Sequence, residues 1–280
     1  MPEAPPTTTA KGWLAPTAAD STLRAMNASF DVICEIEPPT RPDLMHVRHQ
    51  IGVLSKAASA FLIPDNHIGR ATVSSVAVAH EVERMGGRSI ACLNARDRNL
   101  LGFRRDMLTA AAYGVDQFLF VHGDRPVSGR RTGQLTVRSM IEESRAFAAG
   151  NTPTGELRVG VTAGQAPFPA WKRDADFVFM QIGFDLDELL ARRDRIDFDG
   201  PVYAGVMVVA SASMSRKLSV AVPELAVPDA WTDALERDPG AGVDLACALV
   251  DAVRASGAFN GVHLVPVAKY RQVAARLEHR

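Results

Sequence analysis

The stretch Phe30-Asp31-Val32-Ile33-Cys34-Glu35-Ile36-Glu37-Pro38-Pro39 is an apolar segment followed by polar residues and prolines, and it is the first of several apolar segments from which the fold is predicted. Its apolar first half is typical of a buried strand, and the strand must stop at the prolines because proline cannot donate a hydrogen bond to a sheet. Glu35 and Glu37 stand where the strand gives way to a loop, and the two-residue repeat of a strand places them on one side. Carboxyl groups in this position are candidates for proton transfer. The alternative is that both are solvated loop residues.

Further apolar segments follow the first one, and each has a length typical of a strand. Between them lie segments whose apolar residues have helical spacing, such as Leu186, Leu189 and Leu190. The predicted strands after the first are 58–63, 88–93, 117–121, 157–161, 177–180, 202–208 and 261–265. Alternating strands and helices predict an α/β fold with parallel strands, and a total of eight favours a closed (β/α)8 TIM barrel over an open sheet.

The length and composition of the chain fit either one large barrel or two ordinary domains. The chain has 280 residues, of which 47% are hydrophobic and 22% charged. Because the predicted strands use most of the chain, we interpret residues 29–280 as a single catalytic barrel domain. Residues 1–28 are rich in proline, threonine and alanine, and we predict that they form an N-terminal arm.

Charge and cysteine content exclude several classes of partner. The net charge of -1 predicts no broad attraction to nucleic acid or to an anionic membrane. No segment approaches the roughly 20 apolar residues of a membrane span. Cys34, Cys92 and Cys247 are scattered and lack metal-site spacing, so neither a disulfide framework nor a zinc site is expected. We therefore expect a cytoplasmic protein without a bound metal, and a small molecule as its partner.

In a (β/α)8 barrel the active site gathers at the carboxyl ends of the strands, and this rule selects residues by position. Polar side chains follow six of the predicted strands: Glu35, Glu37, Asp65 to His67, Asn94, Arg96, His122, Asp124, Thr162, Gln165 and Gln181. Each of them separately has an alternative interpretation, because turns also require polar residues. Their occurrence around one rim indicates an active site there.

Several common signatures are missing from the sequence. There is no GxGxxG after a strand, no GxxxxGK[ST], no HExxH and no GxSxG, so a Rossmann domain, a P-loop and the commoner hydrolases find no support. The loop Ser128-Gly129-Arg130-Arg131-Thr132-Gly133 could hold a phosphate with its amides and arginines, or it could be a solvated basic loop.

Three short motifs resemble the methylenetetrahydrofolate reductase family, whose catalytic domain is a (β/α)8 barrel. Glu35-Ile36-Glu37-Pro38-Pro39 is similar to the first-strand motif Glu-Phe-x-Pro-Pro of that family. His122-Gly123-Asp124-Arg125-Pro126 resembles its fourth-strand Arg-Gly-Asp-x-Pro, and Gln181-Ile182-Gly183-Phe184-Asp185 resembles its sixth-strand Gln-x-Phe-Phe-Asp. Order, strand placement and spacing agree together, and the motifs cover most of the barrel.

The resemblance implies that 5,10-methylenetetrahydrofolate accepts a hydride and becomes 5-methyltetrahydrofolate, a step of one-carbon metabolism that serves methionine biosynthesis. Glu35 matches the catalytic glutamate of the family, the general acid that protonates the anilino nitrogen and opens the imidazolidine ring. Asp124 matches the aspartate that holds the pterin, and Gln181 matches the glutamine beside it. Glu37 stands at a position that is usually aromatic, and we assign it to the substrate-binding residues with Asp124 and Gln181.

Most members of the family carry flavin, but the chain departs from their flavin-binding pattern. His122 stands where the family has an arginine, and Thr162-Ala163-Gly164-Gln165-Ala166-Pro167 replaces a Tyr-Pro-Glu-x-His-Pro segment. The chain thus resembles the flavin-free branch, in which NADH or NADPH delivers hydride directly to the folate and FAD is absent. The resemblance and the rim positions together predict a nicotinamide site made of Asn94, His122, Thr162, Ala163, Gly164 and Gln165.

Two alternatives stay open beside this interpretation. One is an FAD-dependent reductase with altered flavin contacts, and the other is a non-catalytic accessory barrel that binds a pterin. Retention of both Glu35 and Asp124 favours catalysis, because binding without proton transfer would not need both. Arg96, Arg98 and the pair Arg130-Arg131 are further candidates to meet a pyrophosphate or the glutamate tail of the folate.

Overall fold

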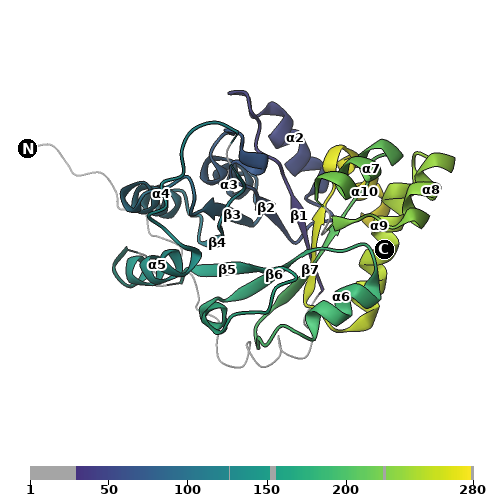
Figure 1. Ribbon diagram of the computed structural model, residues 1–280. Helices are drawn as coiled ribbons and strands as arrows, with labels where there is room; N and C mark the ends of the chain where they lie inside the picture. The colour runs from purple at the N-terminus through teal and green to yellow at the C-terminus, as the bar shows by residue number, and fades with distance from the viewer. Residues whose placement is uncertain (1–29, 126, 152–155, 223–224, 279–280) are drawn as a thin grey trace, which may run out of the picture.

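Residues 30–125, 127–151, 156–222 and 225–278 are described by the computed structural model. Within them eight parallel strands pair in chain order, and the last pairs with the first, so the sheet closes into a barrel (Figure 1). The strands are β1 (Asp31–Glu35), β2 (Ala60–Ile63), β3 (Ser89–Asn94), β4 (Gln117–Val121), β5 (Arg158–Ala163), β6 (Phe177–Ile182), β7 (Val202–Met207) and β8 (Gly261–Val265). The predicted (β/α)8 barrel is confirmed, whereas the predicted arm over residues 1–28 lies outside the described residues.

Helices surround the barrel, and several of them have capping residues at their ends. They are α2 (Met45–Leu54), α3 (Ser75–Arg84), α4 (Leu100–Ala112), α5 (Val137–Asn151), α6 (Leu186–Arg193), α7 (Ala212–Ala221), α8 (Asp229–Arg237), α9 (Ala241–Ser256) and α10 (Tyr270–Glu278). The side chain of Asn99 accepts a hydrogen bond from Gly102 N at 2.8 Å and caps α4, and Asp185 caps α6 in the same way. α9 ends at Gly257, whose φ of 65° lies in the left-handed region that glycine adopts readily.

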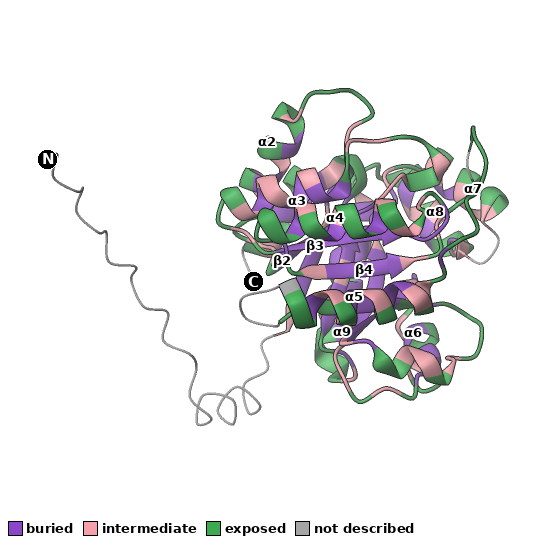
Figure 2. Cartoon of the chain, turned by 90° about the vertical axis from the view of Figure 1, so that its left-hand side faces the viewer, coloured by how far each residue is buried: buried purple, intermediate pink, exposed green. Residues whose placement is uncertain are grey.

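The side chains of each strand alternate between two cores. The inner core fills the barrel and includes Ile33, Leu62, Cys92 and Leu119, while a larger outer core lies between the strands and the helices. Figure 2 shows this arrangement as buried strands enclosed by helices that are exposed on their outer faces. Cys34 belongs to the outer core, so the alternation turns its neighbour Glu35 toward the barrel interior.

Aromatic rings close the barrel toward the amino ends of its strands. The ring of Phe179 lies 5.1 Å from that of Tyr203 and 5.5 Å from that of Phe177. The hydroxyl of Tyr203 donates a hydrogen bond to Asp31 Oδ2 at 3.4 Å, and burial, helped by the Asp31 charge, raises the pKa of Tyr203 to about 12. Within the described residues, these rings fill the barrel interior toward the amino ends of the strands, whereas the large cavity lies at the carboxyl ends.

Candidate active site

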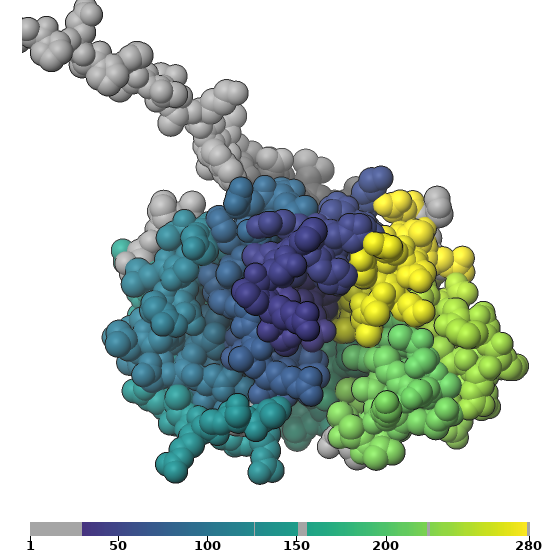
Figure 3. Space-filling view, turned by 90° about the horizontal axis from the view of Figure 1, so that it is seen from above, coloured from purple at the N-terminus to yellow at the C-terminus, as the bar shows by residue number. Residues whose placement is uncertain are grey.

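A cavity of about 720 Å³ opens at the carboxyl ends of the strands, a size typical of small-molecule sites. Its walls come from both halves of the chain, which face each other across the barrel in the view from above (Figure 3). Seven of the residues assigned to catalysis, substrate binding or nicotinamide binding line it: Glu35, Glu37, Asp124, Thr162, Ala163, Gly164 and Gln181. Asp65 and His67 of the predicted rim line it as well. The structure therefore brings together the residues of the three motifs, which come from β1, β4 and β6.

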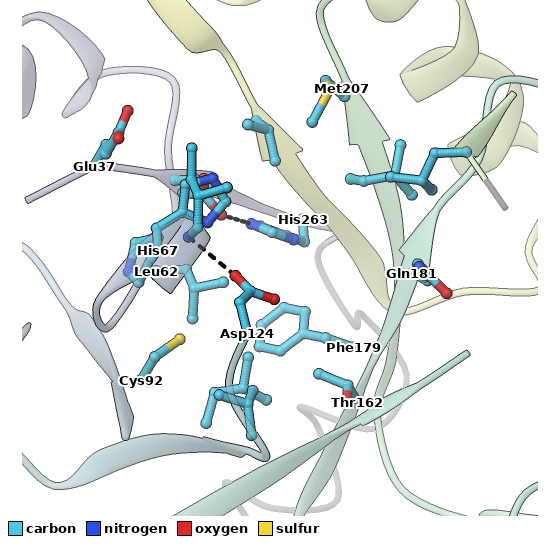
Figure 4. A pocket seen from close by; sticks show the side chains of 18 of the residues that line it. Glu37, Leu62, His67, Cys92, Asp124, Thr162, Phe179, Gln181, Met207 and His263 are labelled. Carbon is cyan, nitrogen blue, oxygen red and sulfur yellow. Dashed lines mark hydrogen bonds and ion pairs between the residues drawn. The ribbon is translucent and has the colours of Figure 1, made fainter. Parts of the chain in front are cut away.

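Glu35 is paired with a histidine that sequence reasoning missed. Glu35 Oε2 lies 3.1 Å from His263 Nε2, and the two side chains are 15% and 11% exposed. His263 lies within β8, opposite Ile33 of β1, so its imidazole faces the barrel interior at the level just below Glu35. The ring of Phe179 contacts the imidazole edge to face, with centroids 5.4 Å apart (Figure 4). A histidine inside the apolar run 261–265 was the signal for this pair.

Glu37 has a different position from Glu35. β1 ends at Glu35, so Glu37 lies beyond the strand, and its side chain is exposed at the edge of the cavity. Figure 4 shows it apart from the pair that Glu35 forms with His263. The two carboxyl groups are thus unequal, because only Glu35 is enclosed and has an imidazole partner.

Asp124 is held at the mouth by the turn that follows β2. Its Oδ2 accepts a hydrogen bond from Ile68 N at 3.0 Å, which leaves Oδ1 and a lone pair of Oδ2 for a ligand. Gly123, just before it, has a φ of 94° and packs so closely that an added Cβ would lie 2.9 Å from Asn94 Cβ. Ile68 and Val267 also line the cavity, with φ values of 55° and 50°. Such values are strained for β-branched residues, and strain of this kind gathers at ligand sites.

Asn94 supports this turn from below and does not line the cavity. Its side chain is fully buried, donates to Asp65 Oδ2 at 2.6 Å and accepts from Asp97 N at 2.9 Å. Arg98 binds the same Asp65 carboxylate, and Arg96 donates to Asp97 at 2.6 Å, which lowers the pKa of Asp97. These contacts hold the loop after β2 in place, and Asn94, Arg96 and Arg98 lie outside the cavity lining.

Two other residues of the predicted nicotinamide site also lie outside the cavity lining. His122 is exposed, because Leu119 and Val121 face the interior of β4 and the alternation turns His122 outward. Gln165 is exposed in the connection beyond β5. Of the predicted nicotinamide-binding set, the cavity therefore brings together only Thr162, Ala163 and Gly164.

Gln181 reaches the cavity because β6 contains a bulge. Phe179 is paired with Tyr203 and Ile182 with Gly205, so β6 has one residue more than β7 over this span. Gly205 makes the bulge possible, since an added Cβ there would lie 2.6 Å from Met180 O. The side chain of Gln181 extends over Gly164, where an added Cβ would lie 3.2 Å from Gln181 Oε1. Figure 4 shows Gln181 across the cavity from Leu62 and Cys92.

The cavity is acidic on one side and apolar on the other. Carboxyl groups of Glu35, Glu37, Asp65 and Asp124 line it, and no lysine or arginine is among the lining residues that the structure describes. The opposite wall consists largely of apolar side chains, namely Ile182, Met207, Met214, Leu218, Leu225, Val265 and Val267. Such a cavity favours a flat ligand that is rich in hydrogen-bond donors, and it disfavours a phosphate.

Two other kinds of chemistry find little support in the described residues. Cys92 lines the cavity, but burial raises its pKa well above the usual value, so its thiol remains protonated and is a poor nucleophile. Within the described ranges, no group of three or more His, Cys, Asp or Glu side chains could hold a metal ion. None of the helices in these ranges is long and apolar enough to cross a membrane.

Comparison with known proteins reveals similarity at the level of the fold. No protein-family model matches the chain, and no curated protein matches it significantly. Among solved structures, an uncharacterized protein from Clostridium thermocellum that binds two copies of 5-methyl-5,6,7,8-tetrahydrofolic acid has a TM-score of 0.62 at 11% identity, over 92% of this chain and 98% of that one. Tryptophan synthase from M. tuberculosis has a TM-score of 0.52 at 12% identity, over 94% of this chain and 96% of that one.

A third similar structure is a β-1,3-glucanosyltransferase from Rhizomucor miehei, with a TM-score of 0.52 at 12% identity over 84% of this chain and 86% of that chain. One of the three binds a folate, one is a tryptophan synthase and one is a glucanosyltransferase, and at this level of identity the similarity shows the barrel fold alone. The function of the chain must therefore be argued from its own cavity.

Proposed function

We propose that the cavity binds a reduced folate and that the protein reduces 5,10-methylenetetrahydrofolate to 5-methyltetrahydrofolate, with NADH or NADPH as the hydride donor. The observation that carries the proposal is the convergence of Glu35, Asp124 and Gln181 on one cavity from three separate strands. A proton donor and two hydrogen-bonding groups for a pterin are what this reaction requires of a protein.

The acidic wall suits the pterin ring. An amino-pyrimidinone edge presents two adjacent N–H donors, and the oxygens of Asp124 that Ile68 leaves available can accept both. Gln181 adds one donor and one acceptor across the cavity, and the apolar wall with Met207 and Met214 can cover a ring face. The similar barrel from Clostridium thermocellum binds a methylated folate, which agrees with this assignment.

Glu35 is the proposed general acid. Its proton goes to the anilino nitrogen of the folate, the bond from that nitrogen to the methylene carbon breaks, and its electron pair stays on the nitrogen. The methylene carbon, now an iminium on the pterin side, accepts the hydride and becomes the methyl group. The nicotinamide supplies that hydride, and Thr162, Ala163 and Gly164 are proposed to lie against it because their small size permits close approach.

Phosphates of a dinucleotide are disfavoured inside the cavity, because its described lining contains no lysine or arginine. The exposed arginines Arg70, Arg125, Arg130 and Arg131 lie outside the lining and are proposed to meet them. FAD also carries phosphates, so the lack of lysine and arginine in the described lining does not distinguish FAD from NADH. The absorbance spectrum and the turnover assay test whether transfer is flavin-free.

The test is oxidation of NADH or NADPH that depends on methylenetetrahydrofolate, in purified protein whose spectrum contains no flavin, with 5-methyltetrahydrofolate identified by mass spectrometry. We expect Glu35→Gln to lower the rate by roughly two or more orders of magnitude, as for loss of a general acid. Glu142→Gln is the matched control, since Glu142 is exposed on α5 and outside the cavity lining.

Each competing interpretation has its own outcome. Turnover that requires added FAD would support the flavin-dependent alternative. Folate binding without turnover under any of these conditions would support the accessory barrel and overturn the reductase assignment. Activity of Glu35→Gln within a few-fold of wild type would remove Glu35 from the mechanism.

A further inference from the structure

The carboxyl group of Glu35 forms its hydrogen bond with one side chain, that of His263. Within the described part of the chain, His263 is the only hydrogen-bond partner of the Glu35 carboxyl, and Glu35 is the only one of the His263 ring. The contact joins β1 to β8, whose backbones pair directly at Ile33 and His263, so both groups are held by the sheet. Phe179 packs against the imidazole from β6 and restricts its rotation.

A carboxyl group and an imidazole in direct contact can share one proton. The proton lies on the carboxyl group beside a neutral imidazole or on the imidazole beside a carboxylate, and the two arrangements have the same total charge. The second arrangement gives the pair a way of holding the proton that a carboxyl group without the imidazole does not have.

We propose that His263 is the positioning residue and proton store of Glu35, an inference that rests on the proposed reductase function. In each turnover the shared proton leaves from the Glu35 oxygen to the anilino nitrogen of the folate. This leaves a carboxylate beside a neutral imidazole, and one proton from solvent then restores the shared proton of the pair. Each turnover therefore consumes one proton from solvent and returns the pair to its starting charge.

The other groups around the pair are neutral in the relevant range or lie elsewhere in the cavity. From β3, the Cys92 thiol stays protonated because burial raises its pKa. From β7, Tyr203 lies deeper and has a pKa of about 12, and Gly205 opposite His263 has no side chain. The remaining titratable groups of the lining are Glu37, Asp65, His67 and Asp124. These four groups are the same in the wild type and in the variants below, so a difference in pH dependence between wild type and His263→Gln reports on the pair of Glu35 and His263.

The test compares the pH dependence of the reductase rate in wild type and His263→Gln, because glutamine keeps a hydrogen-bond donor but cannot store a proton. We expect the falling limb at high pH to move down by about one pH unit or more, so that the rate drops about tenfold at the high-pH end and little at the low-pH end. The KM for the folate should stay within about threefold. His49→Gln is the matched control, because His49 is exposed on α2 and outside the cavity lining.

A purely structural role would lower the rate by the same factor at every pH, or would raise KM instead, and either result would overturn the proposal. A second measurement does not need turnover: nitrogen-15 NMR of the His263 ring during a pH titration of wild type and Glu35→Gln. We expect the midpoint to change by about one unit or more when Glu35 loses its charge. An unchanged midpoint would overturn the shared proton. A changed midpoint in a protein without reductase activity would overturn the proposed function and leave the shared proton standing.

Discussion

Replacing Asp124 by asparagine tests the pterin site without disturbing the fold. Asp124 is exposed, and its only hydrogen bond within the described residues comes from Ile68 N at 3.0 Å. The amide oxygen of asparagine can accept the same hydrogen bond, so the free energy of unfolding should change by no more than about 0.5 kcal/mol. The amide nitrogen then faces the cavity, and it presents a donor to the N–H donors of the pterin.

The expected loss of affinity follows from that mismatch. A hydrogen bond to a charged group contributes about 1.5 to 3 kcal/mol, which corresponds to an increase of roughly 10- to 150-fold in the Kd for 5-methyltetrahydrofolate. Isothermal titration calorimetry of the folate into wild type and Asp124→Asn measures this ratio. Asp187→Asn is the control, because Asp187 is exposed on α6 and outside the cavity lining. A Kd within twofold of wild type would refute the assignment of Asp124 to the pterin.

Two further changes test the cavity and the packing below it. Gly164→Ala places a Cβ 3.2 Å from Gln181 Oε1, so the amide must shift, and we expect the folate Kd, measured by the same calorimetry, to rise roughly three- to tenfold with unchanged thermal stability. Burial raises the pKa of Tyr203 from its ordinary value of 10.0 to about 12, so its contribution to stability is complete below pH 10 and is lost as the pH rises to 12. Urea unfolding should therefore show that wild type loses about 2 to 3 kcal/mol more than Tyr203→Phe between pH 9 and pH 12.

Sequence patterns predicted the barrel because each strand has a local signature. The alternation of apolar segments with helical spacing located all eight strands, since strand length and apolar content are properties of neighbouring residues. α10 was not predicted, although Tyr270, Val273 and Ala274 have helical spacing and are buried. α10 follows the last strand of the barrel, and the alternation of strands and helices does not require a helix there.

The site was predictable where position on a strand decides the outcome. Glu35, Asp124 and Gln181 follow or end their strands and reach the cavity. Asn94 and His122 also stand at strand ends, but they lie outside the cavity lining. The side chain of Asn94 is bound by Asp65, and His122 is exposed because the alternation along β4 turns it outward. Both outcomes depend on which residues face the barrel interior, and the positions of the strand ends alone do not give this.

The partner of Glu35 depends on how the barrel closes. His263 is 228 residues away in sequence, and it meets Glu35 only because β8 pairs with β1. No local pattern contains that pairing, so the segment 261–265 by itself does not connect His263 with Glu35. Once a closed barrel is accepted, however, the first and last strands must be neighbours, and a polar residue inside the last strand becomes a candidate partner for the acid that ends the first.

The distribution of charge also decides how a dinucleotide can approach. A pyrophosphate inside the cavity would face the carboxyl groups of Glu35, Glu37 and Asp124 without a lysine or arginine from the described lining, and an unpaired buried charge is strongly unfavourable. The reduced nicotinamide ring is uncharged, so it can lie between Met207 and the small residues Thr162, Ala163 and Gly164 at the carboxyl end of β5. In the proposed direct transfer of hydride, the nicotinamide ring would therefore lie inside the cavity and the phosphates would stay at the rim. Among the rim residues, Arg130 and Arg131 are exposed, whereas Arg96 and Arg98 are already held by aspartates. The basic loop that contains Arg130 and Arg131 is thus a better candidate for contact with the phosphates than the arginines that directly follow β3.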